Sequence, residues 1–384
     1  MTSRTFPPKA DDRARLLAGV RRVVVKIGSS LIASKNHGLN PQRLEAYAEE
    51  VANLTKAGYE VLIVSSGAIV SGLEKLGLRD KPKSLPEKQA AAAVGQSRLM
   101  WAYEKSFEAK GLKVAQVLLT RDDLTDRRRF LNSRNTLAAL LDLGVIPVIN
   151  ENDTVAVEEI RFGDNDNLAG LVTHLMDAHL LIILSDVEGL YTEDPRLNPQ
   201  ATLIPIVKAI TPEIESRAGA ASGLEGIGGM ASKIQTAKRV AAYGVATVIA
   251  SGKEPDILAR ILRGEEIGTV VLPQTNRLNN RKHWIAYTLR AKGRLVIDDG
   301  AVEALTRKGK SLLPSGIREV EGQFEAGDAV SCIDKKGHEI AKGLVNYGAG
   351  EVAKIKGAKT TDLERILGYK DYDEVIHRDN LVIL

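Results

Sequence analysis

From residue 21 to about residue 273 the sequence alternates short β-branched runs with longer stretches of helical periodicity. Strands that are apolar on both faces and separated by helices are typical of a largely parallel sheet covered by helices on both sides. Six runs fit such strands, at residues 23–27, 61–64, 114–119, 145–149, 180–184 and 245–249. The predicted fold class is therefore α/β, with an αβα sandwich around a central sheet.

The pattern changes between about residues 273 and 291, where asparagines crowd a basic, turn-rich segment. Beyond it, short glycine-punctuated strands predict a compact, mostly β domain of about 80 residues. We therefore predict an N-terminal extension at 1–20, an α/β domain at 21–288, and a β-rich domain with a C-terminal segment at 289–384. The extension has no long apolar run and is expected to be a frayed arm.

Composition excludes several classes of protein. The 384 residues carry 53 Lys+Arg against 49 Asp+Glu, a net charge of +4, which is typical of an ordinary globular protein rather than a disordered or strongly polyanion-binding one. The apolar runs are too short to span a bilayer, so we expect no membrane partner. The single cysteine, Cys332, excludes an intrachain disulfide, which favours a cytoplasmic location and a role for Cys332 as a small core residue.

Small polar residues follow the first two predicted strands. Lys26 precedes Gly28-Ser29-Ser30, and Ser65-Ser66-Gly67-Ala68 follows the second strand. Ligands of open α/β sheets bind at the carboxyl ends of the strands, where a lysine and free backbone N–H groups suit phosphate. The simpler alternatives are a solvated lysine and a helix-capping serine.

Two clusters of short polar side chains follow the fourth strand. They are Asn150-Glu151-Asn152-Asp153-Thr154 and Gly163-Asp164-Asn165-Asp166-Asn167. So many Asn and Asp residues are poor for a helix or strand, and we expect loops joined by a hairpin over the strand ends. The mixture of amides and carboxylates suits an amino-acid ligand, although turn formation alone is the alternative.

Two further segments suit a nucleotide. Ser185-Asp186 ends the fifth strand, and a glycine-rich run over residues 223–232 leads into a predicted helix with Lys233 in its first turn. No pair of Cys or His has zinc-site spacing, so any metal is expected to arrive with a substrate. Lys26 and Lys233 together predict phosphoryl transfer to a small polar acceptor.

Eight ordered motifs run from Arg22 to the C-terminus. They lie at residues 25–30, 64–69, 93–97, 148–153, 163–167, 189–192, 228–230 with Lys233, and 311–316. Together they resemble the glutamate 5-kinases, a branch of the amino acid kinase family with a C-terminal PUA domain. The resemblance implies ATP-dependent phosphorylation of the L-glutamate side-chain carboxylate to L-glutamyl 5-phosphate, the first step of L-proline biosynthesis, with feedback inhibition by proline and Mg²⁺ accompanying ATP.

The resemblance also assigns roles to residues. Lys26 and Lys233 would stabilise the transferring phosphate, and Asp166 would orient them. The residues expected to hold glutamate are Ser66, Asp153, Asn165 and Asn150. Those expected to bind ATP are Lys26, Ser185, Asp186, Ile227, Gly228, Gly229, Met230, Ala231, Ser232 and Lys233. Ile227 replaces a small or hydroxylated residue, which leaves nucleotide preference open.

Expected partners follow from the same resemblance. They are glutamate, ATP, proline, a second copy of the chain in a dimer or tetramer, and a separate glutamyl-phosphate reductase, since no fused reductase follows Leu384. Acetylglutamate kinases and aspartokinases would share both lysines, but the polar clusters and the β-rich tail favour the glutamate 5-kinases. PUA domains elsewhere bind RNA; here residues 291–368 carry 13 Lys+Arg and 12 Asp+Glu without a basic stripe, so RNA is not an expected partner.

Overall fold

The computed structural model describes residues 10–33, 38–78, 82, 84–155, 165–220, 229–274 and 291–384. The chain divides into two units, Met1–Thr275 and Asn276–Leu384, each of which is described by itself. The boundary predicted between residues 288 and 289 falls within 275–290, outside the described residues.

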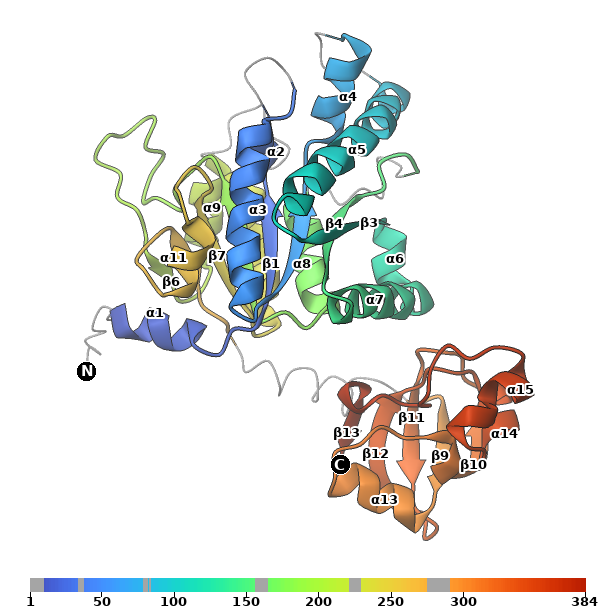
Figure 1. The fold of residues 1–384 in the computed structure, drawn as a ribbon. Helices are drawn as coiled ribbons and strands as arrows, with labels where there is room; N and C mark the ends of the chain where they lie inside the picture. Colours follow the sequence, from blue (N-terminus) through green and yellow to red (C-terminus); the bar gives the residue numbers. More distant parts are fainter. Residues whose placement is uncertain are drawn as a thin grey trace, which may run out of the picture. The chain divides into compact units, whose positions relative to one another are not determined.

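The N-terminal unit is built on a mostly parallel sheet (Figure 1). Among the described residues it has eight strands in the order β3-β4-β2-β1-β5-β7-β8-β6, with only β7 and β8 antiparallel. The strands are β1 Arg22–Ile27, β2 Glu60–Ser65, β3 Lys113–Leu119, β4 Val145–Glu151, β5 Leu180–Ser185, β6 Ile206–Val207, β7 Ala246–Ser251 and β8 Thr269–Val271. All six predicted strands are present, and β6 and β8 are additional.

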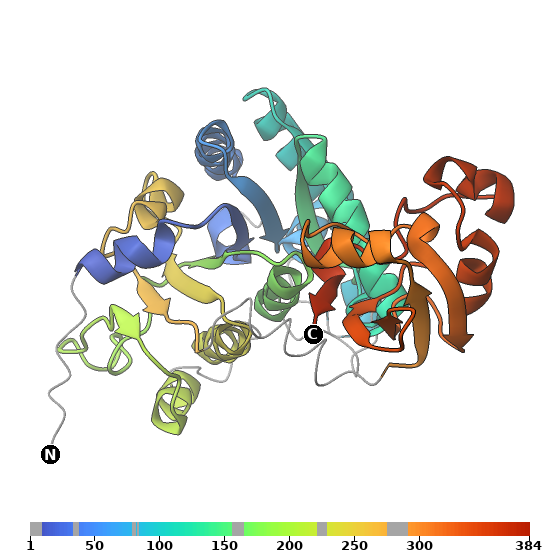
Figure 2. The ribbon, with the colours of Figure 1, turned by 90° about the horizontal axis from the view of Figure 1, so that it is seen from below.

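Helices cover both faces of this sheet (Figures 1 and 2). They are α1 Ala10–Leu17, α2 Ser29–Ile32, α3 Pro41–Lys56, α4 Ala68–Leu76, α5 Leu85–Glu108, α6 Arg121–Thr125, α7 Arg127–Asp142, α8 Asn165–Leu175, α9 Pro212–Ala220, α10 Met230–Ala242 and α11 Ile257–Leu262. Side chains alternate across each strand, so Val23 and Val25 of β1 join the core under α3, α5 and α11, whereas Val24 joins the core under α7, α8 and α10. The expected αβα sandwich is confirmed.

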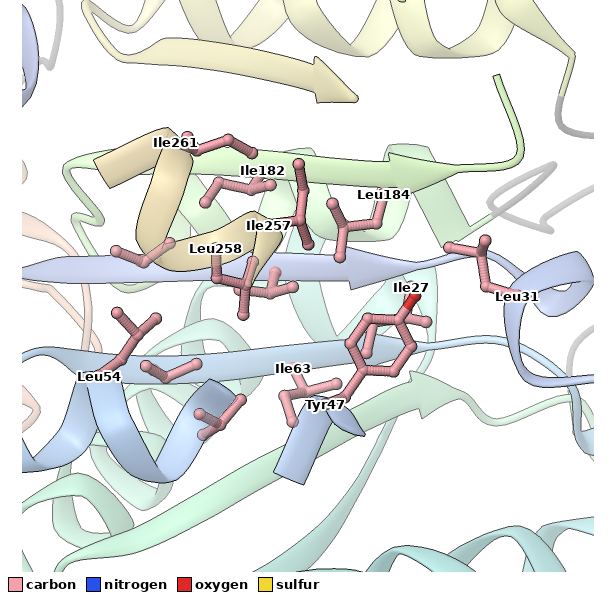
Figure 3. Packing of buried hydrophobic residues seen from close by; sticks show 14 of the residues in the cluster. Ile27, Leu31, Tyr47, Leu54, Ile63, Ile182, Leu184, Ile257, Leu258 and Ile261 are labelled. Atoms are coloured by element: carbon pink, nitrogen blue, oxygen red, sulfur yellow. The ribbon is translucent and has the colours of Figure 1, made fainter. Parts of the chain in front are cut away.

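Figure 3 shows the first of these cores, where Tyr47 and Leu54 of α3 meet Ile27 and Ile63 of the sheet. Helix α3 begins where Asn40 accepts a hydrogen bond from the Arg43 N–H, directly before a proline that suits the first helical position. Each fully buried aliphatic side chain of this kind contributes roughly 1.5–3 kcal/mol.

The N-terminal segment differs from the frayed arm that the sequence suggests. In its described part it forms α1, and Leu17 at the end of that helix is buried in the core beneath α3. The buried Arg13 guanidinium donates a hydrogen bond to the Ile267 carbonyl, and burial lowers the pKa of Arg13. The apolar residues of α1 are too few to form a long hydrophobic run, which is why the sequence gives no sign of this packing.

Helices α4 and α5 cross in backbone contact. A Cβ atom on Gly95 of α5 would lie 1.8 Å from the Ala68 carbonyl oxygen, and one on Gly72 of α4 would lie 1.8 Å from the Ala91 carbonyl oxygen. Only glycine permits so close an approach at these two positions. The crossing fixes α5 against the start of α4, which directly follows Ser66 and Gly67.

The C-terminal unit is the expected small β-rich domain. Its described residues form a five-stranded sheet in the order β10-β9-β11-β12-β13. Its elements are β9 Gly293–Ile297, α13 Asp299–Thr306, η3 Pro314–Gly316, β10 Ile317–Gly322, β11 Ala329–Ile333, β12 Glu339–Leu344, α14 Ala349–Ile355, η4 Thr360–Asp362, α15 Leu363–Leu367, η5 Arg378–Asn380 and β13 Leu381–Ile383. Cys332 is fully buried in the core, where burial raises the pKa of its thiol to about 12, so it is an inert core residue.

Within the described parts of both units, no helix combines the length and the apolar character that crossing a bilayer requires.

Glu50 of α3 predicts a pH dependence of stability. Its buried carboxyl accepts a hydrogen bond from the Leu258 N–H of α11 at 2.8 Å. Burial raises the pKa of Glu50 from 4.5 to about 7, against the lowering effect of that bond. Because the folded state binds the proton more tightly than the unfolded chain, this stabilisation is fully present below pH 4.5 and is lost as the pH rises through about 7.

We expect Glu50→Gln, which keeps an acceptor for Leu258, to remove this dependence. The melting temperature of the variant, relative to the natural protein, should rise by several degrees between about pH 5 and about pH 8, as followed by circular dichroism. Glu45→Gln, at an exposed position of the same helix, is the control. Parallel melting curves for Glu50→Gln and the natural protein across this range would show that Glu50 does not titrate as stated.

Candidate active site

The carboxyl ends of the central strands lie side by side. Ile27 of β1 is in register with Ser65 of β2 and with Leu184 of β5, and Ser185 of β5 is in register with Ser251 of β7. Parallel strands place their carboxyl ends at one edge of the sheet, which is where open α/β sheets bind ligands. Lys26, one residue before the end of β1, therefore lies centrally at this edge.

Three buried charges meet here. The Lys26 Nζ lies 2.5 Å from one carboxylate oxygen of Asp166, and the Lys233 Nζ lies 3.1 Å from the other. Asp166 is fully buried, while Lys26 and Lys233 are 5% and 4% exposed. Two lysines thus contact one carboxylate at the edge of the sheet where anionic ligands bind.

Close packing of two helices positions two members of this group. Asp166 lies in the first turn of α8 and Lys233 in the first turn of α10. Four residues beyond Asp166, a Cβ on Gly170 would lie 2.9 Å from the Thr236 methyl carbon of α10. The absence of a side chain at Gly170 lets the two helices approach, so that Lys233 reaches Asp166.

A cluster of amides and hydroxyls adjoins the charged group. The Asn165 side-chain amide donates to the Ser65 carbonyl at 2.6 Å, to the Ser66 hydroxyl at 3.1 Å and to the Asn150 side-chain carbonyl at 2.9 Å. The Asn150 amide in turn donates to the Gln96 side-chain carbonyl at 2.8 Å. These contacts join β2, β4, α5 and α8 at the same edge of the sheet.

The expectation that both polar clusters are loops was wrong for part of each. Asn150 and Glu151 belong to β4, because β3 pairs with this strand as far as Glu151. Asn165 and Asp166 belong to α8, since short polar side chains are tolerated in a first helical turn. Asp153 lies half-buried in the turn after β4, and the predicted hairpin falls largely on residues 156–164, outside the described residues.

Besides Lys26, the residues predicted to bind ATP lie at two places in the described structure. Ser185 ends β5, and its hydroxyl donates to the Asp186 carboxylate at 3.1 Å. Gly229 is the N-cap of α10 and has no side chain to cap the first N–H groups of this helix, a position that suits phosphate oxygens. Met230, Ala231 and Ser232 form the first turn of α10 and are half-buried, whereas Ile227 and Gly228 lie outside the described residues.

Sequence reasoning missed the contribution of α5. Gln96 and Tyr103 share one face of this helix, and the Tyr103 hydroxyl lies 2.9 Å from the Ser65 hydroxyl. Burial raises the pKa of Tyr103, so it stays protonated. Residues 93–97 form one of the eight motifs, but nothing local signals that Gln96 contacts Asn150, which is 54 residues away.

A metal site was not expected from the sequence. Over the residues that the structure describes, no group of three or more His, Cys, Asp or Glu side chains could hold a metal ion. Asp166 has one lysine against each of its carboxylate oxygens.

Comparison with known proteins identifies the family. The amino acid kinase family model matches residues 21–251. The chain belongs to the amino acid kinase family. The PUA domain model matches residues 293–367, so this amino acid kinase carries a C-terminal PUA domain.

Individual relatives narrow the assignment within the amino acid kinase family. The chain is 54% identical to the glutamate 5-kinase of Geobacter sp. (strain M21) over 372 residues. This match covers 97% of this chain and 100% of that protein. The chain is 52% identical over 368 residues to the glutamate 5-kinase of Moorella thermoacetica, covering 96% of this chain and 97% of that protein. The solved structure of UMP kinase from Bacillus anthracis has a TM-score of 0.47 and 18% identity, covering 67% of this chain and 97% of that one. The resemblance inferred from the motifs is confirmed.

The geometry predicts that Asp166 contributes strongly to the stability of the fold. Asp166→Asn removes the carboxylate that both buried ammonium groups contact, and we expect it to lower the free energy of unfolding by about 3–5 kcal/mol. The control is Asp177→Asn, which breaks the more exposed ion pair with Arg134 and should cost at most about 1 kcal/mol. Urea denaturation of both variants measures the difference; equal losses would contradict the buried pairing.

Proposed function

We propose that this amino acid kinase transfers the terminal phosphoryl group of ATP to the side-chain carboxylate of L-glutamate, giving L-glutamyl 5-phosphate in the first step of L-proline biosynthesis. The observation that carries the proposal is the buried Lys26–Asp166–Lys233 group beside an amide cluster at the carboxyl edge of the sheet. Two relatives named glutamate 5-kinase, each matched over almost the whole chain, support the choice of acceptor.

The paired lysines suit phosphoryl transfer. In this reaction negative charge is spread over the oxygens of the transferring group, and catalysis consists chiefly of positioning and charge stabilisation. In the proposed reaction, Lys26 and Lys233 contact those oxygens while Asp166 sets their spacing. Because a free glutamate carboxylate is already ionised at neutral pH, the reaction needs no general base.

The amide cluster suits the remainder of the acceptor. In the proposal, Asn150, Asn165 and Ser66 orient glutamate, and the Asp153 carboxylate binds its ammonium group. Amide N–H groups serve as donors to carboxylates, whereas amide and carboxylate oxygens accept from an ammonium group. Asn165 directly precedes Asp166 in α8, which puts acceptor binding next to the charged group.

The nucleotide would lie toward β5 and α10. In the proposal, Lys26, Ser185, Asp186 and residues 227–233 bind ATP, with the N–H groups at the start of α10 directed at its phosphates. Mg²⁺ would reach the site on the ATP phosphates, because Asp166 is already engaged by both lysines. When bound there, Mg²⁺ neutralises phosphate charge.

The proposal also covers inhibition by proline, the oligomeric state, the location of the enzyme and the use of its product. Proline inhibits the enzyme because it shares the α-amino acid group of glutamate. The chain works as a dimer or tetramer in the cytoplasm, with domains at 21–288 and 289–384 after an extension at 1–20. Its acyl phosphate product is a reactive anhydride, so a glutamyl-phosphate reductase consumes it.

The reaction is tested by ATP turnover with purified protein and magnesium. L-glutamate, N-acetylglutamate and L-aspartate are compared as acceptors, each with and without proline. We expect turnover only with glutamate and suppression of that turnover by proline. Turnover with another acceptor would retain the phosphoryl chemistry and overturn the substrate, while unaltered turnover in proline would overturn the regulation.

Lys233→Ala tests the role of the lysine pair. Because this lysine stabilises charge that develops in the transition state, kcat should fall by about 10²–10³ while the KM for glutamate changes little. The control is Lys238→Ala on the same helix, where the lysine pairs with Glu215 and is half-exposed. Steady-state kinetics measures both variants; an unchanged kcat in Lys233→Ala would exclude that role.

A further inference from the structure

We propose that Gln96 of α5 is a specificity-determining residue, whose side-chain amide donates a hydrogen bond to the α-carboxylate of the amino-acid acceptor. This inference rests on the proposed function, and it adds a residue from a helix to which no substrate role has been given.

The direction of the hydrogen bonds is fixed at one end. The Ser65 backbone carbonyl can only accept, so the Asn165 group that lies 2.6 Å from it is the NH₂ group. The same NH₂ group faces Asn150, which must therefore present its side-chain oxygen. The Glu151 N–H donates to that same oxygen at 2.9 Å, which independently gives the same orientation.

This orientation leaves a donor on Gln96. The Asn150 side-chain oxygen faces Asn165, so the NH₂ group of Asn150 faces Gln96. Gln96 must therefore present its side-chain oxygen to Asn150. The Gln96 NH₂ group is then directed away from this chain of bonds. Its nitrogen is buried and has no hydrogen-bond partner among the described residues.

A buried donor without an acceptor destabilises the protein by about 1–3 kcal/mol, and such groups call for an explanation. A carboxylate oxygen brought by the substrate would satisfy this donor with a charge-assisted hydrogen bond. Of the two carboxylates of glutamate, the side-chain one is phosphorylated at the lysines and Asp166. Gln96 is separated from Asp166 by Asn165 and Asn150, so it faces the other end, which carries the α-carboxylate.

Helix α5 holds Gln96 rigidly enough for this role. The neighbouring Gly95 brings the backbone of α5 against the start of α4. Leu99 and Tyr103, one and two turns further on, are fully buried, and Tyr103 contacts Ser65. Selective recognition of one ligand group requires such a fixed donor.

Gln96→Glu is the discriminating variant. A glutamate carboxylate still accepts from Asn150, but it removes the donor and repels an α-carboxylate. We measure the KM for L-glutamate and the inhibition constant of its α-amide, isoglutamine, which keeps the side-chain carboxylate. We expect the KM for L-glutamate to rise at least about tenfold and the inhibition constant of isoglutamine to fall. The ratio of the glutamate KM to the isoglutamine inhibition constant should then rise by roughly 10², while the KM for ATP stays unchanged.

The charge-matched control is Ser97→Glu, at an exposed position of the same helix, which should leave both constants unchanged. The inference is overturned if the ratio of the glutamate KM to the isoglutamine inhibition constant in Gln96→Glu stays within roughly threefold of its value in the natural protein. A purely structural glutamine would not affect the choice between acid and amide. If Gln96→Glu fails to fold, Gln96→Met serves instead. It removes the donor without adding charge, and an unchanged glutamate KM in this folded variant likewise overturns the inference.

Failure of the proposed function is recognised separately. If the natural protein shows no glutamate-dependent ATP turnover, the function itself is wrong, and the inference that rests on it falls with it. If the natural protein turns over glutamate and the Gln96 variants behave like it, only the role of Gln96 is excluded.

Discussion

The contact of two buried lysines with the single carboxylate of Asp166 is the interaction on which the rest of the structure depends. Removing charges from water is costly, and a buried ion pair persists only when its geometry is held by surrounding structure. Here β1 supplies Lys26 from the middle of a sheet, and α8 and α10 supply Asp166 and Lys233 from a close helix crossing. In the proposed function, this arrangement of two lysines around one carboxylate suits a phosphoryl group in transfer, because both ammonium groups are held in place at the same edge of the sheet.

A second constraint fixes the geometry of the neighbouring polar cluster. The Ser65 carbonyl imposes one orientation on Asn165, and through it on Asn150 and Gln96, so three amides that could each be turned two ways have one consistent arrangement. These hydrogen bonds hold a single arrangement, because reversing any of the three amides would set two donors or two acceptors against each other. The cluster therefore presents fixed donors to a ligand at no further cost in ordering.

The sequence predicted the features that are periodic or local. Six strands were found because apolar runs have a short-range signature, and Lys26 near a strand end and Lys233 in a first helical turn lie where the local patterns placed them. It missed β6 and β8, which have two and three residues and show no periodicity. It misplaced Asn150, whose strand is extended by pairing with β3, and it could not find the contact of Gln96 with Asn150, which only the tertiary fold creates.

The two halves of the site have separable tasks. The lysines and Asp166 would meet only the phosphate and the carboxylate that receives it, which any acidic amino acid can offer, so they cannot distinguish one acceptor from another. In the proposed function, discrimination comes from groups that reach the rest of the acceptor, and the candidates are the amides of β4, α5 and the start of α8. If these amides recognise the acceptor as proposed, substitutions there change the acceptor and leave the phosphoryl chemistry intact, because the hydrogen bonds described above for Asn150 and Gln96 go to residues other than the lysines.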